Sequence, residues 1–226
     1  MTPKTILDIS LDKTTHMPLC DYTKGGELLR VYFATKNLHK VEEVRMISPN
    51  WIDVLPLPSG FPPAPEGGDT FLENALSKAI FYSKILKSPV VADDSGLMIE
   101  ALGGFPGVFS ARFMEGEDYR RKMEKVLAMM EGEENRSAKF VCVAVLADVG
   151  SGTVLSAVGE VRGEIATSIR GEKGFGYDPI FIPEGFTETF GELGEEVKSK
   201  ISHRSRAFKK LFSSMGSLRI PHHLSG

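Results

Sequence analysis

The feature that most limits the fold of this chain is a pair of long β-rich segments that follow each other closely. The two segments are residues 138–149 and 153–161, and only Gly150-Ser151-Gly152 separates them. A connection this short makes an antiparallel hairpin the simplest way to join two strands. The sequence therefore predicts a sheet that contains this hairpin.

Elsewhere the chain alternates between strand and helix patterns. Short β-rich runs alternate with apolar residues at helical spacing, which predicts an α/β fold. The capping-box spacing of Thr70-Phe71-Leu72-Glu73 predicts the start of one helix. The other signals are a strand at 31–34, a helix that ends before Pro49, an irregular proline-rich connection at 56–65, a strand ending at 90–92, and helices near 118–131 and 202–214.

Composition excludes several classes of protein. The net charge is −3 and the pI is near 6.0, so no broad basic field is available for nonspecific nucleic-acid binding. No apolar stretch approaches the roughly 20 residues that cross a bilayer. The two cysteines, Cys20 and Cys142, are too few for a disulfide framework. We expect a cytoplasmic protein that binds neither nucleic acid nor membrane.

The ends of the chain differ from its middle. Residues 1–28 show weak periodicity and finish in Lys24-Gly25-Gly26-Glu27, so we expect an extension outside the core. We expect residues 29–215 to form a single domain. The segment 216–226 is expected to be a frayed tail.

Two adjacent carboxylates, Asp93 and Asp94, follow the apolar run Val90-Val91-Ala92. Like charges held together at the end of a buried strand usually share a cation or a proton. Oxygen ligands without a histidine or cysteine cluster favour Mg²⁺ or Mn²⁺. The alternative is a turn in which the two aspartates only cap the following segment. The pair alone does not decide between these interpretations.

The loop from Thr35 to Lys40 has the composition of an anion site. It joins a strand to a helix, so helix N-terminal amides, hydroxyl and amide side chains and a lysine all lie near one another. It lacks the glycine spacing of a P-loop. The alternative is an ordinary polar loop in which Asn37 caps the helix. Lys78 is a further candidate phosphate contact, although a solvated lysine is the default for a lone residue of this kind.

Six motifs occur in one order along the chain. They are Thr35-x-Asn37-x-x-Lys40, Thr70-Phe71-x-Glu73-Asn74-Ala75, Ala92-Asp93-Asp94-Ser95-Gly96-Leu97, Gly103-Gly104-x-Pro106-Gly107-x-x-Ser110-Ala111-Arg112, Gly174-Phe175-Gly176-Tyr177-Asp178-Pro179 and Ser202-His203-Arg204. Through these motifs the chain resembles the inosine triphosphate pyrophosphatase family over about residues 29–215.

The resemblance implies an activity and a fold. The activity is hydrolysis of ITP, dITP and XTP to the nucleoside monophosphate and pyrophosphate, which cleanses the nucleotide pool. The cofactor is Mg²⁺, with Mn²⁺ as a substitute, and the usual assembly is a homodimer. The implied fold is an elongated, two-lobed α/β structure around a mixed twisted sheet, with the active site in the cleft between the lobes.

The resemblance also assigns roles to residues. Glu66 and Asp94 are the expected metal ligands, and Asp94 is the expected base for the attacking water. Asp93 is the less certain ligand and is interpreted as support. Glu73 is interpreted first as a capping residue and second as metal-linked. The expected phosphate contacts are Thr35, Lys36, Asn37, Leu38, His39, Lys40 and Lys78, while Arg112 is expected to pair with phosphate or to brace the aspartate loop.

Base recognition is expected from a second set of residues. Phe175 or Tyr177 would stack on the purine, and Arg204 would donate to its 6-keto oxygen, which adenine lacks. The alternatives are a core aromatic role for Phe175 and a helix-start hydrogen bond for His203. The full set is Ser95, Phe175, Gly176, Tyr177, Asp178, Lys198, His203 and Arg204.

Two rival functions follow from the same residues. One is a septum-inhibition-type pyrophosphatase for other modified nucleotides, but its Ser-x-Ser-Pro-Arg start is absent here. The other is a nucleotide-binding module without catalysis, and Asp94 with Glu66 argues against it.

Overall fold

The protein is built around one mixed sheet of six strands. The structure is a computed structural model that describes residues 28–65 and 67–219. The strand order is β2-β1-β3-β4-β5-β6, with β1 parallel to both its neighbours and the remaining pairs antiparallel. The strands are β1 (Leu29–Phe33), β2 (Ile52–Pro56), β3 (Val90–Ile99), β4 (Ser137–Asp148), β5 (Thr153–Ile165) and β6 (Phe181–Pro183).

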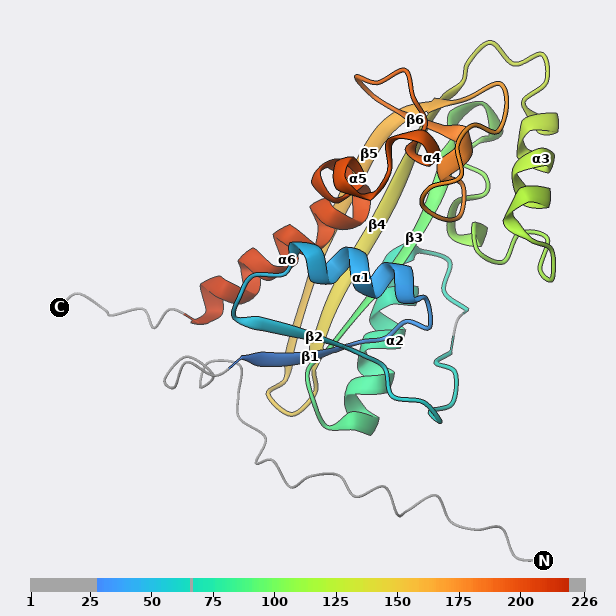
Figure 1. Cartoon of the computed structure of the whole chain (residues 1–226). Coiled ribbons are helices and arrows are strands. Elements are labelled where there is room, and N and C mark those ends of the chain that lie inside the picture. The colour runs from blue at the N-terminus through green and yellow to red at the C-terminus, as the bar shows by residue number, and fades with distance from the viewer. Residues whose placement is uncertain (1–27, 66, 220–226) are drawn as a thin grey trace, which may run out of the picture.

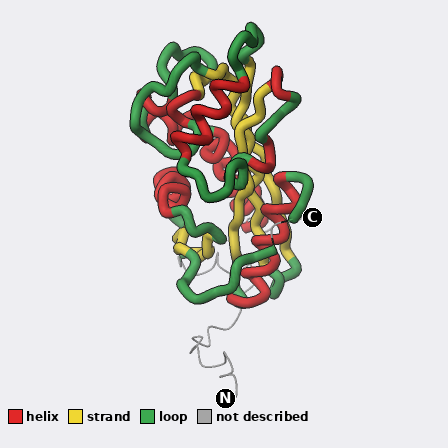
Figure 2. The backbone as a smooth tube through the Cα atoms, turned by 90° about the vertical axis from the view of Figure 1, so that its right-hand side faces the viewer, coloured by secondary structure: helices red, strands yellow, loops and turns green. Residues whose placement is uncertain are grey.

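The helices lie on both faces of this sheet (Figures 1 and 2). On one face α2 packs against β3 and β4, and on the other α6 packs against β4 and β5 and contacts α1. This arrangement confirms the predicted α/β class. The helices are α1 (Leu38–Ile47), α2 (Phe71–Leu86), α3 (Tyr119–Met129), α4 (Phe190–Leu193), α5 (Glu195–Ile201) and α6 (His203–Arg219).

The predicted hairpin is confirmed, and it forms the two longest strands of the sheet. β4 and β5 pair from Asp148 opposite Thr153, next to the turn, to Ser137 opposite Glu164 at the far end. Because the two strands are so long, β1 and β2 lie at one end of the sheet while β6, α3 and α4 lie at the other (Figure 1). The expected elongated shape with two lobes follows from this length.

Local signals position the predicted helices. Asn37 Oδ1 accepts a hydrogen bond from His39 N and caps α1. Thr70 and Glu73 form a reciprocal capping box at the start of α2. Strand β2 and helix α5 were not expected from the sequence. α6 continues past the predicted end near Ser214 and takes in the first residues of the expected tail.

The predicted strand end at Asp93 and Asp94 is wrong. β3 continues through both residues to Ile99, paired throughout with β4. The alternative interpretation of the two aspartates as a turn is wrong for the same reason. β1 pairs only with Val90 and Val91, so one edge of β3 runs beyond β1 from Ala92 onward. Successive strand residues point to opposite faces, so the two carboxylates face opposite ways.

Some expectations fall outside the described residues. Residues 1–27, Glu66 and 220–226 are not described, so the extension, the tail and the division into domains stay predictions. No helix in the described part of the chain is long and apolar enough to cross a membrane.

Candidate active site

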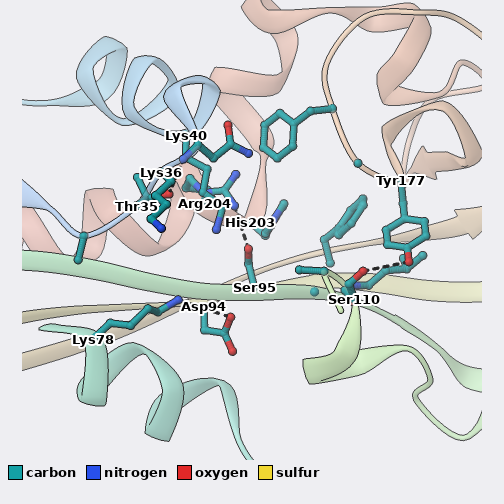
Figure 3. A pocket seen from close by; sticks show the side chains of 18 of the residues that line it. Thr35, Lys36, Lys40, Lys78, Asp94, Ser95, Ser110, Tyr177, His203 and Arg204 are labelled. Carbon is teal, nitrogen blue, oxygen red and sulfur yellow. Dashed lines mark hydrogen bonds and ion pairs between the residues drawn. The ribbon is translucent and has the colours of Figure 1, made fainter. Parts of the chain in front are cut away.

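A cavity of about 610 Å³ lies where β3 runs on past β1. A volume of this size suits a nucleotide-sized ligand. Its walls come from the β1–α1 loop, β3, α2, the segment around Ser110, the loop 175–178 and the start of α6. Figure 3 shows this arrangement, with Asp94 and Lys78 on one side of β3 and Lys40 and Arg204 on the other.

The loop between β1 and α1 lines one end of the cavity. Thr35, Lys36, Asn37 and Lys40 all contribute to the wall. Thr35 Oγ1 accepts a hydrogen bond from Asn37 N at 3.1 Å, which tightens the loop. Asn37 thus both caps α1 and faces the cavity. The start of α1 presents backbone amides here, which favours an anion.

Asp94 lies on the α2 side of β3. Its Oδ2 accepts a hydrogen bond from Asn74 Nδ2 at 3.0 Å, and its Oδ1 is 3.9 Å from Lys78 Nζ. Burial raises the pKa of the Asp94 carboxyl, against the opposing effects of Lys78 and Asn74. Its side chain retains 20 % exposure on the cavity wall. Asp94 is therefore a carboxylate with room for a further partner.

Asn74 connects Asp94 to the segment around Gly68. Its Oδ1 accepts a hydrogen bond from Gly68 N at 2.9 Å while its Nδ2 binds Asp94. Glu73 beside it accepts from the backbone N–H groups of Asp69 and Thr70, so its capping interpretation is confirmed. Glu66, the other expected metal ligand, lies outside the described residues. Within 28–65 and 67–219, no group of three or more His, Cys, Asp or Glu side chains is placed to hold a metal.

Asp93 lies on the opposite face of β3 and is buried. Lys40 Nζ is 3.0 Å from both its carboxylate oxygens, and Arg204 Nε is 3.1 Å from Oδ2. Burial alone would raise the pKa of Asp93, but Lys40 and Arg204 outweigh it and hold the pKa well below its ordinary value. Both oxygens are thus occupied by cations of the protein, as expected for a supporting residue.

Arg204 is buried at the centre of a polar cluster. Besides Asp93, it donates from Nη1 to Glu43 Oε2 at 2.8 Å and from Nη2 to Ser95 Oγ at 2.9 Å. Its guanidinium also lies 5.4 Å from the Phe175 ring centroid. Arg204 lines the cavity, but three of its donors are already used within the protein. Its contact with a 6-keto oxygen stays a prediction.

The far end of the cavity is aromatic. Lys198 Nζ lies 4.0 Å from the Phe175 ring centroid and 2.6 Å from Asp178 Oδ2, which also accepts from Phe175 N. Phe175 is only half-buried, so a pure core role does not describe it. Tyr177 is buried and donates its hydroxyl to Ser110 O at 3.1 Å.

His203 forms part of the same aromatic end. Its ring stacks on Phe140 with the centroids 4.8 Å apart. Burial lowers the pKa of His203 well below its ordinary value, and Arg204 and Lys198 lower it further. Its Nδ1 is buried and finds no hydrogen-bond partner among the described residues. The ring is thus held neutral at the cavity wall.

Gly96 explains how the Ser110 segment reaches β3. A Cβ at this position would collide with the Gly107 carbonyl and the Ser110 hydroxyl. Ser110 Oγ accepts a hydrogen bond from Leu97 N at 2.9 Å, which satisfies the free edge of β3. Only glycine permits this close approach.

Comparison with known proteins assigns the family. The family model described as the Ham1 family matches residues 31–214. This chain belongs to the Ham1 family. The resemblance inferred from the six motifs is thereby confirmed.

Several relatives of this Ham1 chain carry a functional name. A protein named dITP/XTP pyrophosphatase from Aquifex aeolicus (strain VF5) is 44% identical over 194 residues, covering 81% of this chain and 95% of that protein. Another with the same name, from Ignicoccus hospitalis, is 45% identical over 200 residues, covering 87% and 97%. Most of each protein is therefore shared.

Solved structures agree with the Ham1 assignment. A Ham1 protein from Staphylococcus aureus superposes with a TM-score of 0.74 at 36% identity, covering 83% of this chain and 98% of that one. A HAM1 protein from Coxiella burnetii gives 0.75 at 36% identity, covering 84% and 100%. The expected fold is confirmed.

The cavity of this Ham1 chain gathers most of the predicted site residues. The exceptions within the described part are Leu38, which is 65% exposed, and His39, which stacks on Phe175 instead; neither lines the cavity. Arg112 does not line it either, and its guanidinium lies over Phe109. The residues brought together are Thr35, Lys36, Asn37, Lys40, Lys78, Asp94, Ser95, Phe175, Gly176, Tyr177, Asp178, Lys198, His203 and Arg204.

Tyr119 and Glu43 are among the residues of the Ham1 site that sequence reasoning missed. Tyr119, at the start of α3, lines the cavity and meets Tyr177 edge to face with centroids 5.5 Å apart. Glu43 lies behind the cavity and binds Arg204. Glu43 stands three residues after Lys40, on the same side of a helix, which is a weak signal that the sequence did contain.

Proposed function

We propose that this Ham1 chain hydrolyses ITP, dITP and XTP to the nucleoside monophosphate and pyrophosphate. The observation that carries the proposal is a single cavity with lysines, helix N-terminal amides and Asp94 at one end and an aromatic wall at the other. This polarity matches a nucleoside triphosphate. The relatives named dITP/XTP pyrophosphatase support the substrate class.

The triphosphate would occupy the lysine end. A triphosphate carries about four negative charges, which need cations and backbone donors because the protein itself is acidic overall. Lys36, Lys40 and Lys78 supply charge from both sides of β3, and the start of α1 supplies amides. Leu38 and His39 would then shape the loop without direct phosphate contact.

Mg²⁺ is the proposed cofactor, with Mn²⁺ as a substitute. The donors fit, because Mg²⁺ is usually held by one or two carboxylates together with substrate phosphates. Asp94 and Glu66 are the proposed ligands, and Asn74 supports them by joining Asp94 to Gly68, close to Glu66 in the chain. The bound ion would neutralise charge that develops on the phosphates.

Asp94 is also the proposed base for the attacking water. Within 28–65 and 67–219, its Oδ1 accepts no hydrogen bond and lies 3.9 Å from Lys78 Nζ, so it has capacity to accept a proton or orient a water molecule. Asn74 fixes the other oxygen and therefore the plane of the carboxylate. The protein itself thus supplies both a positioned acceptor and its support.

The purine would occupy the aromatic end. Phe175 offers a half-buried ring for stacking, Lys198 and Arg204 lie over that ring, and Ser95 lines the same cavity. A site lined by donors leaves buried groups unpaired when adenine presents its amino group. Replacement of His203 by alanine is expected to raise the KM for ITP.

A homodimer working in the cytoplasm completes the proposal. The homodimer follows from the family resemblance, and the cytoplasmic setting is suggested by a content of only two cysteines. Light scattering of the purified protein at several concentrations would measure its mass. A mass of one chain at all concentrations would contradict the dimer.

Pyrophosphate release from a nucleotide panel tests the function. The purified protein would be incubated with Mg²⁺ and, separately, ITP, dITP, XTP, GTP, ATP and dUTP. We expect release mainly from the first three, and its loss on chelation with recovery after Mg²⁺ is returned. Release mainly from dUTP would favour the septum-inhibition-type activity instead. Binding of ITP without turnover would favour a binding module.

A further inference from the structure

Glu43 is a buried carboxylate with two partners. It lies on α1 and is 1% exposed. Ser202 Oγ donates to its Oε1 at 2.6 Å, and Arg204 Nη1 lies 2.8 Å from its Oε2. Both carboxylate oxygens are therefore used to join α1 to the start of α6. A buried charge of this kind is costly unless it is fully paired, so its position is tightly defined.

Arg204 connects Glu43 to two residues that line the cavity. Its Nη2 donates to Ser95 Oγ, and its Nε donates to the same Asp93 that binds Lys40. Lys40 and Ser95 both line the cavity. The guanidinium is rigid and planar, so holding one of its nitrogens sets the direction of the others.

The hydrogen bond from Arg204 determines which way the Ser95 hydroxyl can act. A guanidinium has no acceptor, so Ser95 Oγ must accept. The hydrogen of the Ser95 hydroxyl then remains available, because within 28–65 and 67–219 this hydroxyl donates to no other residue. The oxygen of this hydroxyl is bound by Arg204, so its hydrogen is free to donate into the cavity. Figure 3 shows Ser95 on the cavity wall, next to Arg204.

We propose that Glu43 is a positioning residue for nucleotide binding, which holds Arg204 so that Ser95 is oriented as a donor and Lys40 stays paired with Asp93. This inference rests on the proposed function for the identity of the nucleotide. Without Glu43, Asp93 would be the one carboxylate left to Arg204 among residues 28–65 and 67–219, and Arg204 would compete with Lys40 for it. Both ends of the substrate would then lose a correctly placed donor.

The loss of Glu43 should leave the position of Asp94 unchanged. Asp94 lies on the other face of β3, where Asn74 Nδ2 donates to its Oδ2 at 3.0 Å and Lys78 Nζ is 3.9 Å from its Oδ1. A loss of Glu43 should therefore weaken binding and spare the chemical step. This split between KM and kcat distinguishes positioning of the substrate from a general loss of structure.

The test compares Glu43→Gln with Glu42→Gln. Glu42 is exposed on the same helix, so its replacement removes the same charge without touching the cluster. For Glu43→Gln we expect the KM for ITP to rise roughly tenfold, with kcat within about threefold of wild type. Glu42→Gln should leave both within about twofold. The dissociation constant for ITP, measured by calorimetry with a chelator present, should follow the KM.

A double-mutant cycle with Ser95→Ala tests the route. If Glu43 acts through Arg204 on Ser95, the effects of the two substitutions on ITP binding will be less than additive. Full additivity, or a folded Glu43→Gln protein with unchanged affinity for ITP, would overturn the proposal.

If the Glu43→Gln variant does not fold, the Ser202→Ala variant takes its place, because loss of the Ser202 hydroxyl frees only one oxygen of Glu43. We expect a rise in KM of about threefold there, and an unchanged KM would overturn the proposal.

Failure of the proposed function would look different. A wild-type protein that binds ITP but releases no pyrophosphate would refute the hydrolase activity and leave the binding comparison valid. A wild-type protein that does not bind ITP would overturn both proposals.

Discussion

Lys40 and Asp93 form a partly buried ion pair in which the lysine Nζ lies 3.0 Å from both carboxylate oxygens. The pair ties α1 to the middle of β3, and Arg204 binds the same carboxylate from α6. Because successive residues of a strand point to opposite faces, Asp94 faces the cavity from the other side of β3. Two adjacent and chemically identical residues thus have different roles.

Asp93→Asn should destabilise the protein strongly. It leaves the buried Arg204 and the partly buried Lys40 with one negative partner fewer, and breaking a buried pair typically costs about 3–5 kcal/mol. Urea unfolding measures the free energy. Asp53→Asn on β2, outside the cavity, is the control and should cost about 1 kcal/mol or less. A similarly small loss for Asp93→Asn would contradict a structural role for this ion pair.

Asp94→Asn should abolish turnover while preserving binding. Loss of the acceptor for the water proton is expected to lower kcat by roughly 10²- to 10⁴-fold. ITP affinity, measured by calorimetry, should change little. Glu73→Gln is a matched carboxylate control, because glutamine also completes a capping box. If Glu73→Gln reduced kcat as much as Asp94→Asn, the metal-linked interpretation of Glu73 would return.

Tyr119→Phe should weaken substrate binding without affecting stability. The Tyr119 hydroxyl makes no hydrogen bond within the described part of the chain, and its ring lies on the cavity wall 39% exposed. We expect the KM for ITP to rise by about 2- to 10-fold, as for one lost hydrogen bond. Steady-state kinetics and thermal unfolding measure the two quantities.

Tyr177→Phe provides the contrast. Its hydroxyl is committed to Ser110, so its removal should lower stability by about 1 kcal/mol and leave the stacking surface intact. Identical behaviour of the two variants would contradict the assignment of a substrate contact to Tyr119.

His203 should make stability depend on pH. Burial, Arg204 and Lys198 hold the pKa of folded His203 well below 6.5, the ordinary value that applies when the chain unfolds. As pH falls through 6.5, the unfolded chain binds a proton that the folded chain does not, so the free energy of unfolding decreases. The limit for one such group is about 1.4 kcal/mol per pH unit.

Urea unfolding between about pH 5 and 6.5 would measure this slope. In that window Asp93 and Glu43 contribute little, because their ordinary values of 3.8 and 4.5 lie below it. His203→Gln should flatten the pH dependence. An unchanged slope in this variant would show that another group is responsible.

Patterns of neighbouring residues predicted much of the fold. The β4–β5 hairpin, the capping box at Thr70 and the cap at Asn37 depend on residues within a few positions of each other, and all three were found. β2 was missed because Pro56 ends it and the proline-rich segment begins there. The predicted end of β3 was wrong because two charged residues usually end a buried strand, whereas here the strand continues through both of them.

The sequence by itself determined the family, the fold class and most of the residues that line the cavity, because these are carried by motifs with fixed local spacing. Only the tertiary structure decided which carboxylate each cation binds. Glu43 and Arg204 are 161 positions apart, and no local pattern encodes their 2.8 Å contact. The different roles of Asp93 and Asp94 have the same origin, since a strand alternates its faces and only packing establishes which face meets α6 and which meets α2.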